Sequence, residues 1–272
     1  MQARSLFLPV ALLLYASTSA AFAADGDITV NRAMLRSSAS TEKEVSLGVG
    51  VGPSYLGGKL RKWYVGVDAE LNFGNGVFFS GEDGLGYRFL ETTSGFSMAA
   101  SIGASPSRQE RDNRDGNRFN RLQGMGDINA KLQANVFLNY DNGPFHVNTA
   151  VHQTLAKRRG TGIDVSAGYD LLAEHDDLVR ADVGMAYANR SLMQTFFGID
   201  KAQSVNTGYN VYTPDAGIAG AAASVSWRHA FNRNWTSTVG IGVVKLRGPA
   251  ADSPLTERAT SPVASAMVGY RF

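Results

Sequence analysis

Runs of strictly alternating side chains are the feature that most limits what this chain can fold into. In INAKLQANVFLNY (128–140), an apolar residue occupies every second position, and the positions between them are mainly polar. Successive side chains of a β-strand point to opposite faces, whereas a helix needs apolar residues spaced by about 3.6 positions. Comparable runs recur at 45–52, 63–73, 163–171 and 179–187. The sequence therefore predicts an all-β protein.

Three further features predict that these strands cross a membrane. The runs are about 9–13 residues long, which is the length that spans a bilayer as a tilted strand. Tight turns such as 73–76 and 140–144 alternate with the long polar stretches 105–122, 190–215 and 248–261, a pattern typical of bacterial outer-membrane barrels. Aromatic residues gather at the run ends, as interfacial girdles require: Trp63, Phe73, Tyr140, Phe145, Trp227, Phe231, Trp235, Tyr270 and Phe272.

The predicted fold is a transmembrane antiparallel up-and-down β-barrel of about twelve strands, with short periplasmic turns and long extracellular loops. The runs 77–81 and 84–90 are too short to span a bilayer alone, so a barrel of ten strands is the alternative. The expected strand cores are 44–54, 62–73, 77–81, 84–90, 95–104, 126–140, 144–156, 162–173, 178–189, 217–231, 235–247 and 262–272.

The N-terminal residues have the features of a cleaved secretory signal peptide. Arg4 precedes the apolar run 6–15, and Ala21-Phe22-Ala23 fits a cleavage site. The run is shorter than the roughly 20 apolar residues of a transmembrane helix. The expected organisation is a signal peptide (1–23), a periplasmic N-terminal segment that is either a disordered tail or a short plug (24–43), and an outer-membrane barrel (44–272).

Composition excludes several classes of function. The chain has no cysteine, which removes thiol catalysis and thiolate metal sites. Its 26 basic and 24 acidic residues leave a net charge of +2, which gives no argument for nucleic acid as a partner. We expect no cofactor and no bound metal.

Several short glycine-rich stretches resemble those of a known family. They are VGVGPSYLGG (49–58), DGLGYRFL (83–90), LQGMGDI (122–128), FFGIDKAQS (196–204) and ADSPL (251–255), followed by a GYRF ending. Together and in this order they are similar to the MipA/OmpV (MltA-interacting protein-like) family of Gram-negative outer-membrane proteins. One departure is KLRKWYVGV (59–67), where the family often has a proline-containing stretch.

This resemblance implies a monomeric outer-membrane barrel. In one family member it implies a scaffold that tethers a lytic transglycosylase, which is a murein hydrolase, and a murein synthase. Other members are linked to adhesion, osmotic response or drug susceptibility. The terminal aromatic Phe272 also resembles the signal that the barrel-assembly machinery reads in outer-membrane proteins generally.

Charged residues at inward positions of the predicted strands are candidates for lining the lumen. Because a small barrel fills its interior with side chains, we expect an internal network of ion pairs and hydrogen bonds. A selective channel is the alternative, since rings of charge set ion preference. The candidates are Asp68, Glu70, Asp127, Lys131, His146, His152, Asp164, Asp170, Arg180, Asp182, Arg228 and Arg271.

The two histidines His146 and His152 do not predict an enzyme. A nucleophile–base pair needs a nearby serine within hydrogen-bond reach and a third orienting group, and no His-x-Ser occurs here. Six positions along a strand also separate the two rings too far for a shared metal ion. We therefore assign no catalytic and no metal-binding residues.

Two loops carry further candidates. The stretch 105–122 holds arginines that either pair with acids of the same loop or contact lipopolysaccharide phosphates, which guanidinium groups bind in a bidentate manner. The stretch 190–208 lacks alternation and is expected to form an ordered cap over the pore, because its apolar side chains need burial; an exposed adhesive patch is the alternative. The lipopolysaccharide candidates are Arg108, Arg111, Arg114, Arg118 and Arg121.

GMGDI (124–128) contains Gly-x-Gly, but a strand follows it where a nucleotide-binding motif needs a helix. The preferred hypothesis is thus a non-enzymatic envelope scaffold in the outer membrane that contacts outer-membrane lipid, lipopolysaccharide and murein enzymes. A narrow porin-like channel for small polar solutes and an adhesin are the alternatives.

Overall fold

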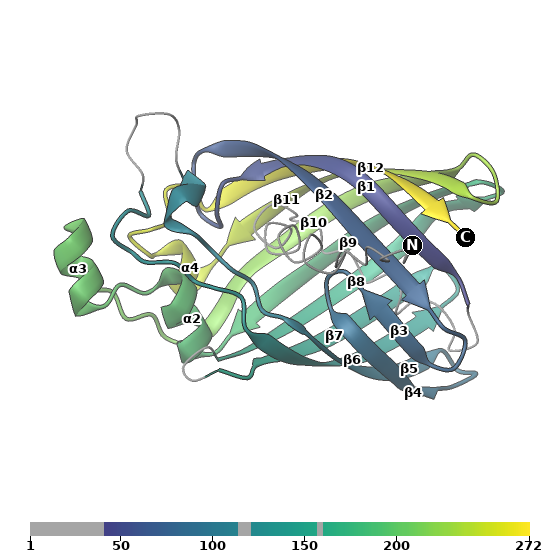
Figure 1. The fold of residues 1–272 in the computed structure, drawn as a ribbon, viewed down its shortest axis with the longest axis horizontal. Helices are drawn as coiled ribbons and strands as arrows, with labels where there is room; N and C mark the ends of the chain where they lie inside the picture. The colour runs from purple at the N-terminus through teal and green to yellow at the C-terminus, as the bar shows by residue number, and fades with distance from the viewer. Residues whose placement is uncertain (1–40, 114–120, 157–159) are drawn as a thin grey trace, which may run out of the picture.

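The computed structural model describes residues 41–113, 121–156 and 160–272, and it shows a closed antiparallel β-barrel (Figure 1). The signal peptide and nearly all of the segment 24–43 lie outside the described residues. The strands of the barrel are β1 (Lys43–Pro53), β2 (Arg61–Asn72), β3 (Val77–Ser80), β4 (Gly84–Glu91), β5 (Phe96–Ala104), β6 (Leu132–Asn142), β7 (Phe145–Thr154), β8 (Thr161–Glu174), β9 (Asp177–Ala188), β10 (Gly217–Ala230), β11 (Trp235–Leu246) and β12 (Thr260–Arg271).

The barrel closes where its first and last strands meet. Each strand pairs with its neighbours in sequence, and β1 pairs with β12 from Glu44 opposite Arg271 to Val51 opposite Ala264. Closure is how a barrel avoids the two free edges of an open sheet in lipid. The short runs do form a hairpin, β3–β4, which confirms twelve strands over ten. Because β3 has only four residues, its ladder with β2 covers Glu70–Asn72 alone.

The pleat of each strand sorts apolar side chains to the outside and polar ones to the inside. Trp63 is 76% exposed on the outer face, and Leu47 and Val65 are exposed on the same face, whereas Ser46 and Asn135, at alternate positions of their strands, are buried in the interior. A continuous exposed apolar surface of this extent does not suit water, but it suits the hydrocarbon of a bilayer.

Aromatic side chains form a band around the turn end of the barrel. The ring centroids of Phe96 and Tyr140 are 4.5 Å apart, and those of Phe145 and Tyr169 are 4.7 Å apart. At the seam, Tyr270 lies between Trp235 at 5.0 Å and Phe272 at 6.3 Å. Such bands mark the membrane–water interface of outer-membrane barrels, so the terminal phenylalanine belongs to this girdle.

Short helices occupy the other end, which we call the loop end. They are η3 (Glu110–Asn113), α2 (Arg190–Phe197), α3 (Lys201–Thr207) and α4 (Gly248–Ala251), and α2, α3 and α4 lie together there, opposite the C-terminus (Figure 1). Asp200 begins α3 with a capping box, in which its carboxylate accepts from the Gln203 N–H and the Gln203 side chain accepts from the Asp200 N–H. No helix in the described part of the chain is long and apolar enough to span a membrane.

The predicted strand 126–140 is wrong at its start. Alternation continues to residue 128, but β6 begins at Leu132. Gly124 and Gly126 adopt positive φ angles of 84° and 77°, which turn the chain inside the loop. Ile128 then pairs with Arg108 of the same loop instead of joining the wall.

Candidate functional site

Glu44 joins four strands at the seam of the barrel. Its carboxylate is 4% exposed and forms ion pairs with Arg228 on β10 and, at 3.5 Å, with Arg271 on β12. The Thr236 hydroxyl on β11 donates to Glu44 Oε1 at 3.2 Å. A β-carbon at position 269 would lie 2.5 Å from the same oxygen, so a larger residue in place of Gly269 would displace the carboxylate from this position. The seam is thus held inside by one buried carboxylate and two guanidinium groups.

A second cluster lies on the wall formed by β6 to β9. His146 Nδ1 lies 2.7 Å from Asp141 Oδ1, and its Nε2 lies 3.0 Å from Asp170 Oδ2. Arg180 Nε donates to Asp170 Oδ1 at 2.6 Å. Asp182 is buried on the same strand as Arg180, and its Oδ1 has no hydrogen-bond partner among the residues that the structure describes.

His152 belongs to a third cluster, nearer the loop end. Its Nε2 lies 2.9 Å from Asp164 Oδ2, and its Nδ1 lies 2.9 Å from Asn135 Oδ1. Asn135 Nδ2 donates in turn to Ser101 Oγ at 2.9 Å. In the described ranges, no three His, Asp or Glu side chains are grouped to hold a metal ion.

The lumen candidates therefore fall into separate groups. Asp68 and Glu70 lie on the inward positions of β2, which pairs with β1 and β3. The prediction that Asp127 and Lys131 line the lumen is wrong, because both side chains are exposed and precede β6. Asp127 accepts a hydrogen bond from the Glu110 N–H inside the loop. The candidates that the structure brings into contact with one another are His146, Asp170 and Arg180; His152 and Asp164; and Arg228 and Arg271, through Glu44.

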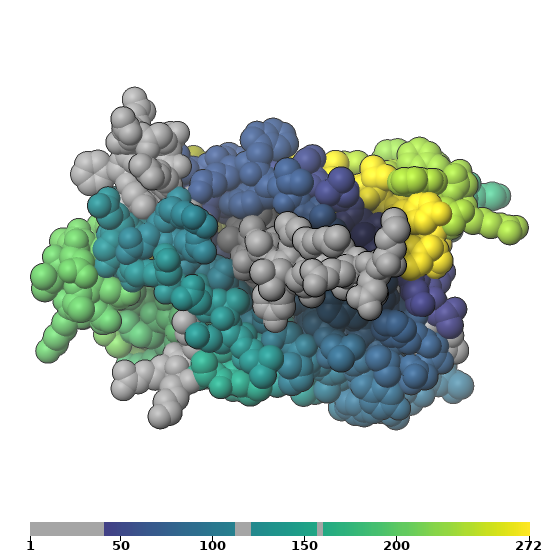
Figure 2. Space-filling model, viewed as in Figure 1, coloured from purple at the N-terminus to yellow at the C-terminus, as the bar shows by residue number. Residues whose placement is uncertain are grey.

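The stretch 190–208 does form a cap over the loop end, as expected. Met193 and Phe197 of α2 are buried with Ala188, Leu246 and Ala250 in one apolar cluster. A second cluster joins Met125, Ile199 and Leu255, which come from three different loops. The green segment that carries α3 forms the outermost part of this end in the space-filling view (Figure 2).

Hydrogen bonds between loops fix the cap. They connect side chains of one loop to backbone carbonyls of another, so the loops are joined to one another. The bonds run from Ser253 Oγ to Phe197 O at 2.6 Å, Tyr212 OH to Pro249 O at 2.8 Å, Tyr55 OH to Leu255 O at 2.8 Å, and Gln203 Nε2 to Met125 O at 2.7 Å.

The loop arginines have different surroundings. Arg108 is 7% exposed and donates to the Phe196 carbonyl, so its expected outward orientation is wrong. Arg121 lies 4.0 Å from Glu257 and 5.4 Å from the Tyr209 ring, whereas Arg111 is exposed on η3. Arg114 and Arg118 lie outside the described residues.

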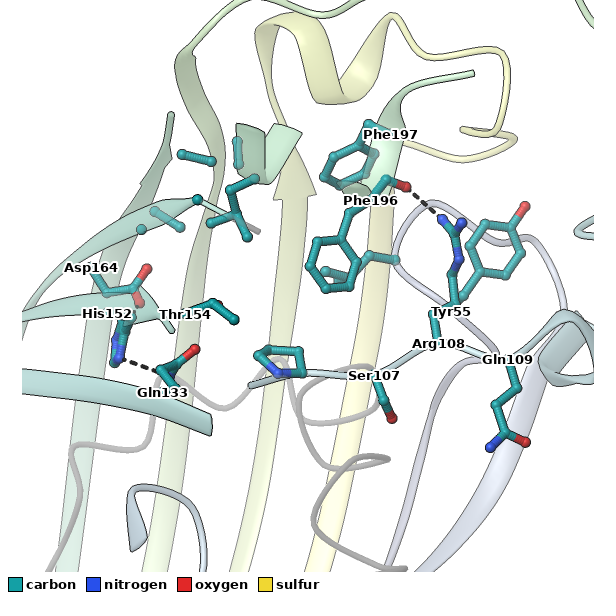
Figure 3. A pocket seen from close by; sticks show the side chains of 18 of the residues that line it. Tyr55, Ser107, Arg108, Gln109, Gln133, His152, Thr154, Asp164, Phe196 and Phe197 are labelled. Atoms are coloured by element: carbon teal, nitrogen blue, oxygen red, sulfur yellow. Dashed lines mark hydrogen bonds and ion pairs between the residues drawn. The ribbon is translucent and has the colours of Figure 1, made fainter. Parts of the chain in front are cut away.

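A cavity of about 340 Å³ lies between the cap and the barrel wall. Figure 3 shows Phe196 and Phe197 on the cap side and His152, Asp164 and Thr154 on the wall side. Sequence reasoning identified the charged residues and not the cavity itself. Its one usable signal was the pair of phenylalanines in a polar loop, which had to be buried against something.

The buried Tyr55 hydroxyl makes the stability of the cap depend on pH in the alkaline range. Burial, and then the negative charge of Glu257, raises the pKa of this phenol above its ordinary value of about 10. The folded cap therefore holds the proton more tightly than the unfolded chain does. The resulting stability is complete below about pH 10 and is lost as the pH rises toward the folded pKa.

We expect brief proteinase K treatment to cut the loops of the folded barrel increasingly above about pH 10. Tyr55→Phe should remove this increase of cleavage above about pH 10, because phenylalanine has no proton to lose. The variant should also weaken the cap at every pH by about 1 kcal/mol, since one hydrogen bond is lost. If cleavage of the phenylalanine variant still rises above about pH 10, another titrating group is responsible for the loss of the cap's stability.

An apolar exterior, a polar interior, an aromatic girdle and unequal connections together define an outer-membrane β-barrel. The sequence profile described as "MltA-interacting protein MipA" matches residues 45–272, and the chain belongs to this family. No curated protein sequence is significantly similar to this chain.

Solved barrels resemble the chain at low identity. A KdgM porin in complex with disordered oligogalacturonate is 12% identical, with a TM-score of 0.43, over 84% of this chain and 99% of that one. The translocator domain of the autotransporter NalP from Neisseria meningitidis is 12% identical, with a TM-score of 0.48, over 88% of this chain and 91% of that one. The closed twelve-strand topology defines the fold of this chain independently of these resemblances.

Proposed function

We propose that this barrel is a non-enzymatic scaffold that presents its turn end to murein-remodelling enzymes in the periplasm. The observation that supports this most is the fixed cap: four loops are joined by buried apolar clusters and hydrogen bonds at the loop end. Loops that are joined to one another in this way suit a static anchor better than a pore that must open and close. Membership of a family named for interaction with MltA points to a murein enzyme as the partner.

The turns carry the proposed contact. Because the short connections of outer-membrane barrels face the periplasm, the proposal assigns residues 73–76, 143–144, 175–176 and 231–234 to the murein side. The cluster formed by Asp177, His229 and Trp227 borders these turns, with His229 Nδ1 and Trp227 Nε1 at 2.9 and 2.7 Å from Asp177 Oδ1. A rigid polar rim of this kind gives a partner defined groups to contact.

A binding measurement tests the scaffold directly. The purified barrel in neutral detergent is immobilised, and a purified MltA-type lytic transglycosylase is passed over it. Replacing residues 232–234 with Gly-Ser-Gly is expected to weaken binding by about tenfold or more, as loss of an interface anchor does. The matched control is Lys201→Gln on α3 at the loop end, which should bind like the wild type. Equal binding by both variants would move the contact away from the turns.

The second candidate is a narrow pore for small polar solutes, favoured by the charged groups that line the lumen. In planar bilayers we expect the wild-type barrel to show no steady openings, because the cap covers the loop end. Phe197→Ala removes a buried ring of the cap and is expected to produce flickering conductance. Steady openings of the wild type would favour the pore over the scaffold.

Three further assignments complete the proposal. The chain is exported with a cleaved signal peptide, so the mature protein begins near Ala24. N-terminal sequencing of the barrel purified from outer membranes tests this start. Phe272 is part of the signal for the barrel-assembly machinery. Arg121 contacts lipopolysaccharide phosphates, and a charge-reversed variant should make the envelope more sensitive to detergent.

A further inference from the structure

The cavity beneath the cap is apolar on one side and polar on the other. Leu56, Leu192, Phe196 and Phe197 line it from the loops, whereas Gln133, His152, Thr154 and Asp164 line it from β6, β7 and β8 (Figure 3). At about 340 Å³ it lies within the range of sites that hold small organic molecules, roughly 300–1,000 Å³. Such sites are mainly apolar with a few converging polar groups, and this cavity has that composition.

The charge around the cavity is unevenly compensated. Asp164, the carboxylate of its lining, lies 2.9 Å from His152 Nε2 and is engaged there. Lys62 on β2 and Arg111 on η3 also line the cavity, and in the described part of the chain no carboxylate lies within ion-pair distance of either. The lining therefore favours a negative group.

We propose that this cavity binds a small organic anion with an apolar body. The apolar part lies beneath α2, between Leu192 and Phe196, and the anionic end points to Lys62 and Arg111. His152, held on both ring nitrogens by Asp164 and Asn135, provides a fixed polar wall beside the ligand. The proposal is independent of the scaffold function, because it concerns the loop end and not the turns.

Three naphthalene probes of one shape test the required charge: 2-naphthoate, 2-naphthamide and 2-naphthylmethylamine, which are an anion, a neutral amide and a cation. Each is titrated calorimetrically into the full barrel in neutral detergent, with empty micelles as the partition blank. We expect saturable binding of the naphthoate at one site per barrel, with the amide weaker by about tenfold or more, and no binding of the amine. Equal signals from all three probes would overturn the proposal.

Variants locate the site. Lys62→Gln combined with Arg111→Gln should weaken naphthoate binding by about tenfold or more and leave the amide unchanged. Ala186→Phe, which fills the cavity from β9, should abolish binding of both probes. Ala219→Leu repeats this test from β10 if the phenylalanine variant does not fold, as judged by its gel mobility before and after heating.

Lys201→Gln combined with Arg258→Gln removes two exposed positive charges outside the cavity and is the matched control for net charge; it should bind like the wild type. Naphthoate binding that survives both cavity-filling variants, or that falls equally in this control variant, would contradict the proposed site.

Discussion

Replacing Glu44 with alanine is expected to lower the free energy of unfolding by about 3–5 kcal/mol. The substitution leaves the Arg228 and Arg271 guanidinium groups inside the barrel without the carboxylate that they share. The cost of breaking a buried pair is mainly the penalty for the uncompensated charge that remains. Since Glu44 also accepts from Thr236, the loss loosens β1, β10, β11 and β12 together at the point of closure.

Urea unfolding of the folded barrel in micelles, followed by tryptophan fluorescence, measures this effect. Asp215→Asn is the matched control, because Asp215 and Arg190 form an ion pair at 2.8 Å with side chains 78% and 67% exposed. Such surface pairs contribute little, so its midpoint should stay at the wild-type value. Equal midpoints for the Glu44 and Asp215 variants would show that water in the lumen compensates the two arginines.

Phe78→Ala is expected to cost about 3–5 kcal/mol as well, for a different reason. The ring of Phe78 is fully buried in the lumen, in contact with Ala99 and Phe137. It is the main apolar contact of the four-residue strand β3, whose short ladders with β2 and β4 hold it weakly. Truncation removes this contact and leaves a void between β3 and the opposing wall.

A double-mutant cycle separates packing from general loosening of the hairpin. A β-carbon at position 86 would lie 2.2 Å from Phe78 Cζ, so Gly86→Ala should destabilise the wild type by about 1–3 kcal/mol through overpacking. In the Phe78→Ala background the same change meets no ring and should cost much less, which gives a clear coupling between the two sites. If the effects of Phe78→Ala and Gly86→Ala on the free energy of unfolding are additive, the alanine side chain at position 86 does not contact the Phe78 ring.

The sequence predicts which side chains of the cap are buried, but not which residues they contact. Burial of Met193, Phe197 and Ile199 was predictable, because apolar side chains in a loop need cover. Their contacts were not, since they come from loops far along the chain: Arg108 and Phe196 are 88 positions apart. Arg108 was misjudged for the same reason. An arginine in a polar loop has no local signal that distinguishes an outward guanidinium from one that holds a neighbouring loop.

The start of β6 shows a local limit. The alternation before Leu132 has the same period as the strand itself, so periodicity extends the strand back to residue 128, and the expected core begins at residue 126. Positive φ angles at Gly124 and Gly126 and the bridge from Ile128 to Arg108 turn this segment into the loop. Asp127 and Lys131 therefore leave the predicted lumen, although their positions in the alternating pattern are correct.

The amino-acid pattern alone predicted the outward apolar face, the girdle, the unequal connections and a barrel of about twelve strands, whereas the β3–β4 hairpin of the structure decided for twelve strands over ten. The predicted features follow from the two-residue period of a single pleated strand and from the composition of the turns beside it. The tertiary structure decided which charges meet, such as Glu44 with Arg228 across 184 positions, and which loops form the cap and its cavity. These contacts depend on the stagger between strands and on loop packing, and the pattern within one strand carries no information about either.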